Sequence, residues 1–371
     1  MKTSRLYILA AAFITPLFIA SCESKMEPTL TEVHPVLAPA VYGAFEQPST
    51  RVVTYPIDIQ NAEHNGFTSV PNAVPLPIGS TVWLMYRRAI DGITNPDPNN
   101  SAHWGPSDLK AYVVKADEEM GFNALYPVPY SENTSEGTLV ISDNLESYAT
   151  PLYLNDGYYQ FRAVSPAYPI RKTDYKMKVD NGMWLYANDE RYNQTKSAVI
   201  YVGGTNVQNV QLQPMISQVA RIDIRLSPKS NNISKMEIMD QGIEISGLQN
   251  PETTDGSNLM FQWSSMSIAD TLKMKRGEKG RTLVIHDFTT EESGAIVGTA
   301  AILPTDAMST MVVVLINMAV NGIPTQYILT LSQMKFFHGH SYLLDLELDL
   351  NGNVYVMNWA NQSWSGEAHL N

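Results

Sequence analysis

The residue with the clearest chemistry in this sequence is Cys22, the only cysteine among 371 residues. It ends the run Ile19-Ala20-Ser21-Cys22, which fits the bacterial lipobox, where the cysteine thiol takes up a lipid and becomes the first residue of the mature chain. A basic start, Met1–Arg5, and an uncharged apolar run, Leu6–Ala20, precede it. These are the regions of a secretory signal, because the apolar run is too short for a stable membrane span.

We therefore expect a lipoprotein signal peptide over residues 1–21 and a lipid on Cys22. Since one acyl chain binds a membrane only marginally, the several chains of a bacterial lipoprotein would anchor it stably. The alternative is a plain signal peptide with an unrelated cysteine near the cut. A single cysteine also excludes a disulfide within the chain and a cysteine-based metal cluster.

The other residues with chemical potential form weaker patterns. His338 and His340 would share one face of a strand, but no third metal ligand lies nearby in the sequence. Glu347 and Asp349 superficially resemble the start of a calcium loop, yet the twelfth loop position is Asn358 rather than a bidentate glutamate. The sequence has no G-x-S-x-G elbow and no phosphate-binding glycine loop. A carboxylate pair could come from distant strands, but no pattern points to one. We expect no catalytic residue, metal or cofactor, and so no enzyme.

Composition restricts the partners and the size of the fold. The formal net charge is −12 and the pI about 5.0, which argues against nucleic acid as a partner. Apolar residues make up 44% and charged residues 17%, as in a globular chain. The length left after a signal peptide exceeds what one core usually serves, so two domains are expected.

Short apolar runs broken by Gly, Pro, Asn and Asp follow one another along the chain and predict an all-β fold. In the run 219–226, Ile222, Ile224 and Leu226 alternate with charged residues, which indicates a strand with one buried face. Asn321-Gly322 and Asn351-Gly352 stand between apolar runs and predict two hairpins, because both residue types tolerate positive φ. Further strands are expected at 81–87, 109–115, 158–165, 311–319, 325–331, 343–350 and 354–357.

These elements predict two tandem antiparallel β-sandwich domains, over residues 52–213 and 214–371. Residues 22–51 are rich in proline and form a tether with one short strand around 36–45, and the first convincing strand is 52–59. A polar loop is expected over 91–106, containing His103 and Trp104. Exposed aromatics can bind glycans, but we interpret the strand residues Tyr158, Tyr159 and Phe161 as packing residues.

Several stretches together resemble the Bacteroidales fimbrillin family, the lipoprotein subunits of type V pili. Residues 156–166 resemble its "G-x-Y-x-F-x-A-x-S-P" strand, 183–189 its "D-L-M-Y-A" region and 212–222 its "L-x-F-x-H-x-L-A-K-L" segment. Residues 339–346 and 354–359 resemble the family's last two strands. The chain has Ser217 or Gln218 where the family usually has histidine, and Arg221 where it has lysine. The resemblance implies two transthyretin-like sandwiches.

The resemblance also implies a route of maturation. The precursor reaches the outer membrane through a lipid on Cys22, and a trypsin-like protease then cuts after an arginine, which we place at Arg51. The cut removes the leader 22–51 and its strand, and a strand from another subunit fills the groove. We expect the donor at Val354–Trp359, with Val354, Val356 and Trp359 as its alternating residues. Alternatively, Arg51 is an ordinary linker residue and 354–359 closes the last hairpin.

The resulting hypothesis is a stalk or tip subunit of a type V fimbria at the cell surface. Its partners would be other fimbrial subunits and a receptor on a host or bacterial surface. The alternative is a permanently anchored surface lipoprotein that binds glycan. The two differ in whether the lipid on Cys22 is retained.

Overall fold

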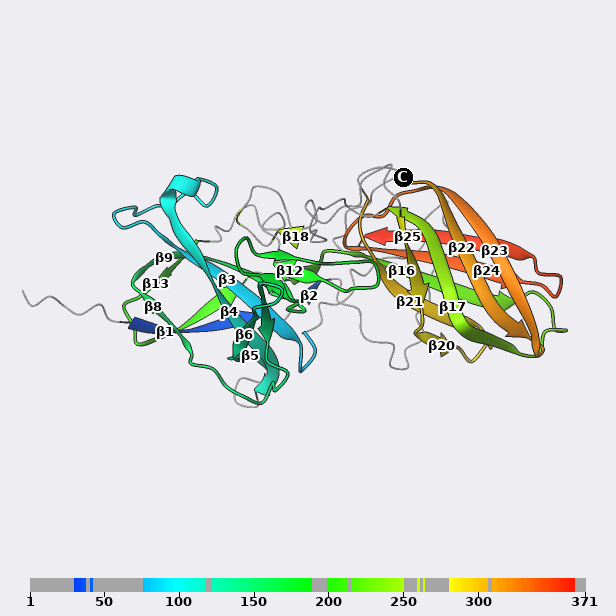
Figure 1. The fold of residues 1–371 in the computed structure, drawn as a ribbon, viewed down its shortest axis with the longest axis horizontal. Helices are drawn as coiled ribbons and strands as arrows, with labels where there is room; N and C mark the ends of the chain where they lie inside the picture. Colours follow the sequence, from blue (N-terminus) through cyan, green and yellow to red (C-terminus); the bar gives the residue numbers. More distant parts are fainter. Residues whose placement is uncertain are drawn as a thin grey trace, which may run out of the picture.

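The protein is described by a computed structural model, which covers residues 30–37, 41–42, 76–117, 122–188, 199–212, 215–249, 259–260, 263, 280–305 and 309–363. Within these ranges the chain forms β-strands, with one 3₁₀ turn at Ser101–His103 as the helical element. Two units lie next to each other along the long axis, the first ending at β15 and the second beginning at β16 (Figure 1). The all-β prediction is confirmed. The described residues contain no helix that is long and apolar enough to cross a membrane.

The largest sheet of the first unit lies at its centre. Its strands are, in spatial order, β2 (Val41–Tyr42), β15 (Met215–Ser217), β12 (Tyr186–Asn188), β9 (Gly157–Ser165), β3 (Thr81–Ala89), β4 (Trp104–Asp117) and β5 (Phe122–Pro127), with β13 (Val199–Val202) also paired to β9. β3 and β9 are buried on both faces, which explains why the sequence 82–85 is an unbroken apolar run rather than an alternating one.

Two smaller sheets cover the faces of this central sheet. One has the order β14 (Val207–Leu212), β1 (Leu30–Leu37), β8 (Leu152–Asn155). The other has the order β18 (Leu259–Met260), β11 (Lys176–Met177), β10 (Ile170–Arg171), β7 (Thr138–Ile141), β6 (Tyr130–Asn133). Leu84 and Phe161 pack with the first small sheet, and Trp83 and Met85 with the second. The first unit therefore has three layers, where the sequence predicted a two-layer sandwich.

The second unit is a two-layer sandwich. One sheet has the order β20 (Phe288–Thr290), β21 (Ile296–Ile302), β16 (Ala220–Pro228), β24 (His340–Leu348), β25 (Val354–Ser363). The other has the order β19 (Gly280–Ile285), β17 (Met236–Gln249), β22 (Ser309–Val320), β23 (Ile323–Met334). Ile222, Ile224 and Leu226 are at most 1% exposed, as the alternation predicted.

Among the described strands, three pairs run parallel, so the sheets are mixed and not purely antiparallel as expected. β1 is parallel to β14, β2 to β15, and β16 to β24. Parallel neighbours need long connections, and the sequence signals for hairpins report only on adjacent strands. The position of β15 also takes the first unit beyond the expected boundary at residue 213, and the chain enters the second unit at β16.

Both predicted hairpins form. Asn321 and Gly322 have φ values of 50° and 80° between β22 and β23, the geometry of a tight two-residue turn. Between β24 and β25, the Asp349 carboxylate accepts hydrogen bonds from the backbone N–H groups of Asn351 and Asn353 at 2.8 and 2.9 Å. The Tyr355 hydroxyl donates to it at 3.1 Å. The donors around this carboxylate, first of all the Asn353 side chain, lower the pKa of Asp349 to about 2.

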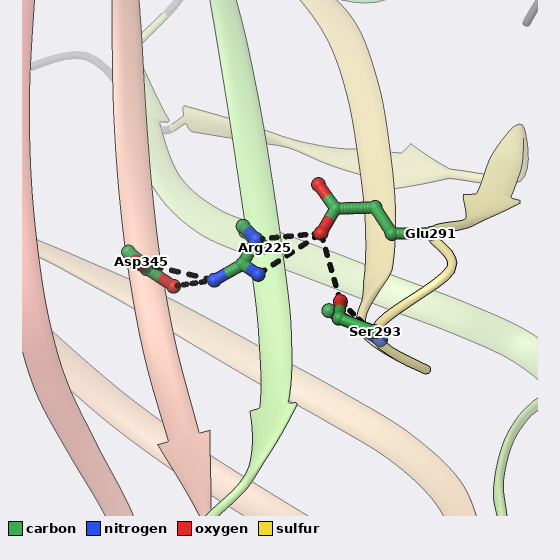
Figure 2. A network of polar contacts seen from close by, with 5 residues as sticks. Arg225, Glu291, Ser293 and Asp345 are labelled. Carbon is green, nitrogen blue, oxygen red and sulfur yellow. Dashed lines mark hydrogen bonds and ion pairs between the residues drawn. The ribbon is translucent and has the colours of Figure 1, made fainter. Parts of the chain in front are cut away.

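The outer face of β16 carries charges that are satisfied within the sheet. Figure 2 shows Arg225 between Glu291 and Asp345, at 2.9 and 3.2 Å. The hydrogen bond from Arg225 lowers the pKa of Glu291 below its usual range. The fully buried Asp223 carboxylate accepts from Arg221 at 2.8 Å and from Thr299 at 2.6 Å. These charges therefore find their partners within the sheet.

The two units are joined by an apolar core and by a crossing segment. One continuous hydrophobic cluster contains residues of both units. β18 belongs in sequence to the second unit but pairs with β11 of the first. Beyond it, the Trp263 ring lies 4.7 Å from the Arg87 guanidinium, and its indole N–H donates to Ser107 at 2.7 Å. Non-covalent contacts therefore join the two units in addition to the covalent link at β15–β16.

Candidate subunit interface

β1 occupies the middle of a sheet although it is the first described strand of the chain. It pairs parallel with β14 from Glu32↔Val207 to Leu37↔Leu212 and antiparallel with β8 from Leu30↔Asn155 to Val33↔Leu152. The backbone groups of β1 are therefore used on both sides. β14 and β8 both pair with β1 in this sheet. Without β1, the edge of each strand that now faces β1 would be unpaired.

The side chains of β1 alternate between a buried and an outer face. Thr31 and Val33 are each 1% exposed, and Val33 packs in the cluster that contains Leu152 and Val210. The Thr31 hydroxyl also donates to the Thr205 carbonyl at 2.8 Å. This period of two fits an apolar groove lined by β8, β14 and the central sheet.

On the outer face, Glu32 lies between two polar neighbours. Its carboxylate is 2.8 Å from His34 Nε2 and accepts from the Tyr153 hydroxyl at 3.1 Å. The hydrogen bond with His34 is the main reason that the pKa of Glu32 is lowered. β1 is thus held by backbone pairing, an apolar inner face and a polar outer cluster.

The strand before Arg51 starts earlier than the sequence predicted. A strand was expected around 36–45, whereas β1 covers Leu30–Leu37 and the short β2 covers Val41–Tyr42. Glu32 and Pro35 weaken the strand pattern of β1 in the sequence, and its pairing with strands on both sides compensates for them. Cys22, Arg51 and the expected strand 52–59 lie outside the described residues.

The predicted donor strand is the edge strand β25. It pairs antiparallel with β24, with Val354 opposite Leu348, Val356 opposite Leu346 and Trp359 opposite Leu344. Cross-strand partners share a face, so Val354 and Val356 lie on the core side of their sheet. Val356 is nevertheless 46% exposed because β25 has no neighbour on its outer edge among the described strands.

Strands β8 and β14 are the parts of this site that sequence reasoning missed. Leu152 and Leu154 are buried and alternate with exposed residues, a period of two that could have identified β8. In β14, Val-Gln-Asn-Val-Gln-Leu, only Val210 and Leu212 alternate with a polar residue, and this pattern is too short to predict a strand.

The remaining candidate residues take part in packing and hydrogen bonds within the fold. Tyr159 and Phe161 are each 3% exposed and belong to the core, as interpreted from the sequence. The polar loop after β3 is shorter than expected, since β4 begins at Trp104, which is 6% exposed and donates to the Asp97 carbonyl at 2.8 Å. His340 is 4% exposed and lies against Phe337 and Tyr342. Within the described ranges, no three His, Cys, Asp or Glu side chains are grouped to hold a metal ion.

Comparison with known proteins identifies the family of this chain. The family model described as fimbrillin-like matches residues 31–368, from the second residue of β1 to beyond β25. The chain belongs to the fimbrillin-like family. The match thus covers both β1 and β25, the first and last strands of the candidate interface.

Solved structures were compared with this fimbrillin-like chain. A candidate cell adhesion protein from Bacteroides fragilis NCTC 9343 matches with a TM-score of 0.62 and 29% identity, over 92% of this chain and 100% of the other. A fimbrial assembly protein from Parabacteroides distasonis ATCC 8503 matches with a TM-score of 0.40 and 9% identity, over 90% and 96% of the two chains. The second similarity is too low to support an argument. No curated protein matches the chain.

Proposed function

We propose that this fimbrillin-like chain is a structural or adhesive subunit of a surface fimbria, in the stalk or at the tip, and not an enzyme. Membership of the family and the similarity to the Bacteroides fragilis candidate adhesion protein support this assignment. The precursor is exported to the outer membrane with a lipid on Cys22 and is cut after Arg51. Its partners are other fimbrial subunits, together with a receptor on a host or bacterial surface.

The observation that carries the proposal is the position of β1. β1 precedes Arg51 in the sequence and fills the middle of a three-stranded sheet. A cut after Arg51 would leave β1 bound by non-covalent contacts alone. Its departure would expose the edges of β8 and β14 and the apolar side chains of Leu152 and Val210, a groove that an extended strand of another subunit can fill.

β25 has the properties of the incoming strand. It contains ten residues without proline, whereas Pro35 of β1 has no N–H to donate to the sheet. Among the described strands β25 pairs with β24 alone, and in the groove it would pair on both sides. At the position of Pro35, β25 would supply an N–H that β1 lacks, and each net hydrogen bond contributes about 1 kcal/mol.

Replacement of the arginine tests the proposal directly. An Arg51→Ala precursor should keep its lipid and stay monomeric, while the neighbouring Thr50→Ala control should be cut and form ladders on a denaturing gel. N-terminal sequencing of assembled fibres should find Val52 first. Fibres that begin at Cys22 would refute the maturation step. A permanently lipidated surface protein with saturable carbohydrate binding would favour the alternative, a glycan-binding lipoprotein.

A further inference from the structure

Exposed apolar side chains gather at the end of the first unit where β1 begins. Leu30 is 54% exposed, Val207 is 53% exposed and Tyr201 is 49% exposed. We call these three residues the β1-start surface. Tyr158 extends it, since its ring meets that of Tyr201 edge to face at 5.2 Å. This end lies away from the second unit (Figure 1).

Direct contacts connect the elements of this surface. Leu30 pairs with Asn155 at the end of β8, and the N–H of Glu32 donates to the carbonyl of Asn206 at 2.9 Å. The Gln208 side chain donates to the Tyr201 carbonyl at 2.8 Å. The start of β1, the turn between β8 and β9 and the turn between β13 and β14 therefore form one continuous surface.

The charges next to the surface do not favour an anionic or cationic partner. Arg88 pairs with Asp91 at 2.6 Å and donates to the carbonyl of Asp156 at 2.6 Å. Glu32, opposite Val207, pairs with His34 at 2.8 Å, and the exposed Asn155, Asp156, Thr205 and Asn206 lie in the two turns. The exposed aliphatic side chains and tyrosine rings are therefore set among polar residues. This mixture is typical of protein surfaces in the interfacial region of a membrane, where a tyrosine buries its ring and keeps its hydroxyl hydrated.

The covalent chain limits what can lie against this surface. Cys22 and Leu30 are eight residues apart in the sequence. An extended chain spans at most ~3.6 Å per residue, so a lipid on Cys22 stays within roughly 29 Å of the start of β1. A twelve-residue strand such as β22 is already about 40 Å long. The end of the first unit where β1 begins is therefore held within this distance of the bilayer, whereas no such limit holds the far end of the second unit near it.

We propose that in the lipidated precursor the β1-start surface lies on the lipid bilayer, with Leu30, Tyr201 and Val207 in the headgroup region. This inference rests on the proposed lipid on Cys22. In this orientation the turn between β24 and β25 is at the opposite end of the molecule and points away from the membrane (Figure 1). The loop after β3 emerges near the membrane, so it meets a receptor only after β1 has been released.

A single engineered thiol reports on this orientation, because the lipid occupies the only natural cysteine. Tyr201→Cys and Leu350→Cys replace side chains that are each 49% exposed, at the two ends of the molecule. Each would be made in the Arg51→Ala precursor, labelled with a fluorophore and reconstituted in phosphatidylcholine vesicles with nitroxide-labelled headgroups. We expect quenching at position 201 and none at position 350. Equal quenching at both positions, or none at either, would overturn the proposal.

The mass of the purified chain shows whether Cys22 is acylated, so failure of the proposed function can be distinguished from failure of this proposal. If Cys22 carries no acyl chain, the export step of the proposed function fails, and the surface is tested by sedimentation of the unlipidated chain with the same vesicles. Tyr201→Ser with Val207→Ser should then weaken binding roughly tenfold, through the lost apolar area, while Met357→Ser at the other unit should not. Absence of binding, or equal effects of the two changes, would overturn the proposal in that case.

Discussion

Truncation of Val33 should weaken the hold of β1 on its groove in a measurable way. Val33 is 1% exposed and packs with Leu152 and Val210, so Val33→Ala removes two buried methyl groups and leaves a small cavity. The transfer and cavity contributions together amount to about 2 kcal/mol. If this free energy of about 2 kcal/mol is lost from the bound state of β1 alone, β1 should dissociate about thirtyfold faster.

The assay is displacement of β1 after cleavage. The precursor is cut with a trypsin-like protease, and a labelled peptide of sequence 354–363 is added. The rate at which the peptide enters the groove is followed by fluorescence, and with excess peptide this rate reports the departure of β1. Val36→Ala is the matched control, because Val36 is on the half-buried outer face of the same strand.

The result that would refute the reasoning is equally specific. Equal acceleration by Val36→Ala would mean that the inner face does not hold β1. An unchanged rate in Val33→Ala would mean that the peptide enters elsewhere, for example beside the free edge of β25. Either outcome would remove β1 as the strand that closes the subunit.

Two further predictions concern the second unit and its attachment. The pKa of Asp349 is lowered to about 2 from 3.8, so its stabilisation is complete above the unfolded pKa and is lost as the pH falls from about 4 towards 2. In urea unfolding, the stability of Asp349→Asn should depend less on pH in this window, and an unchanged pH dependence would contradict the assignment. Trp263→Ala removes the ring over Arg87 and the hydrogen bond to Ser107, and should lower the free energy of unfolding by about 2 kcal/mol. Trp263→Phe, which keeps a ring, should lose less, and equal losses would show that the ring contact contributes nothing.

Local signals in the sequence predicted the strands and hairpins of the second unit well. Asn321-Gly322 adopts the positive φ angles that these residue types tolerate, and the alternation around Ile224 matches the buried face of β16. Such signals are reliable because turn geometry and the two-residue period depend on neighbouring residues alone.

The first unit was predicted less well because its central sheet is covered twice. β3 and β9 are buried on both faces, so their sequences have no alternation that would reveal a third layer. The crossing of β18 to β11 is equally invisible, since two residues of strand carry no pattern. The loop after β3 was overestimated because Trp104 looks like an exposed loop residue in the sequence, whereas the Asp97 carbonyl and the Arg87 guanidinium hold it inside.

The sequence by itself determined the all-β class, the hairpins and the likeness to fimbrillins, because each depends on residue types at short spacing. Only the tertiary structure decided where β1 lies: between β8, from the middle of the first unit, and β14, from its end. Pairing across such separations depends on the complementarity of a whole groove, in which Val33 and Thr31 fit between the walls that β8 and β14 supply. That position makes β1 part of the core, and the proposed assembly depends on it.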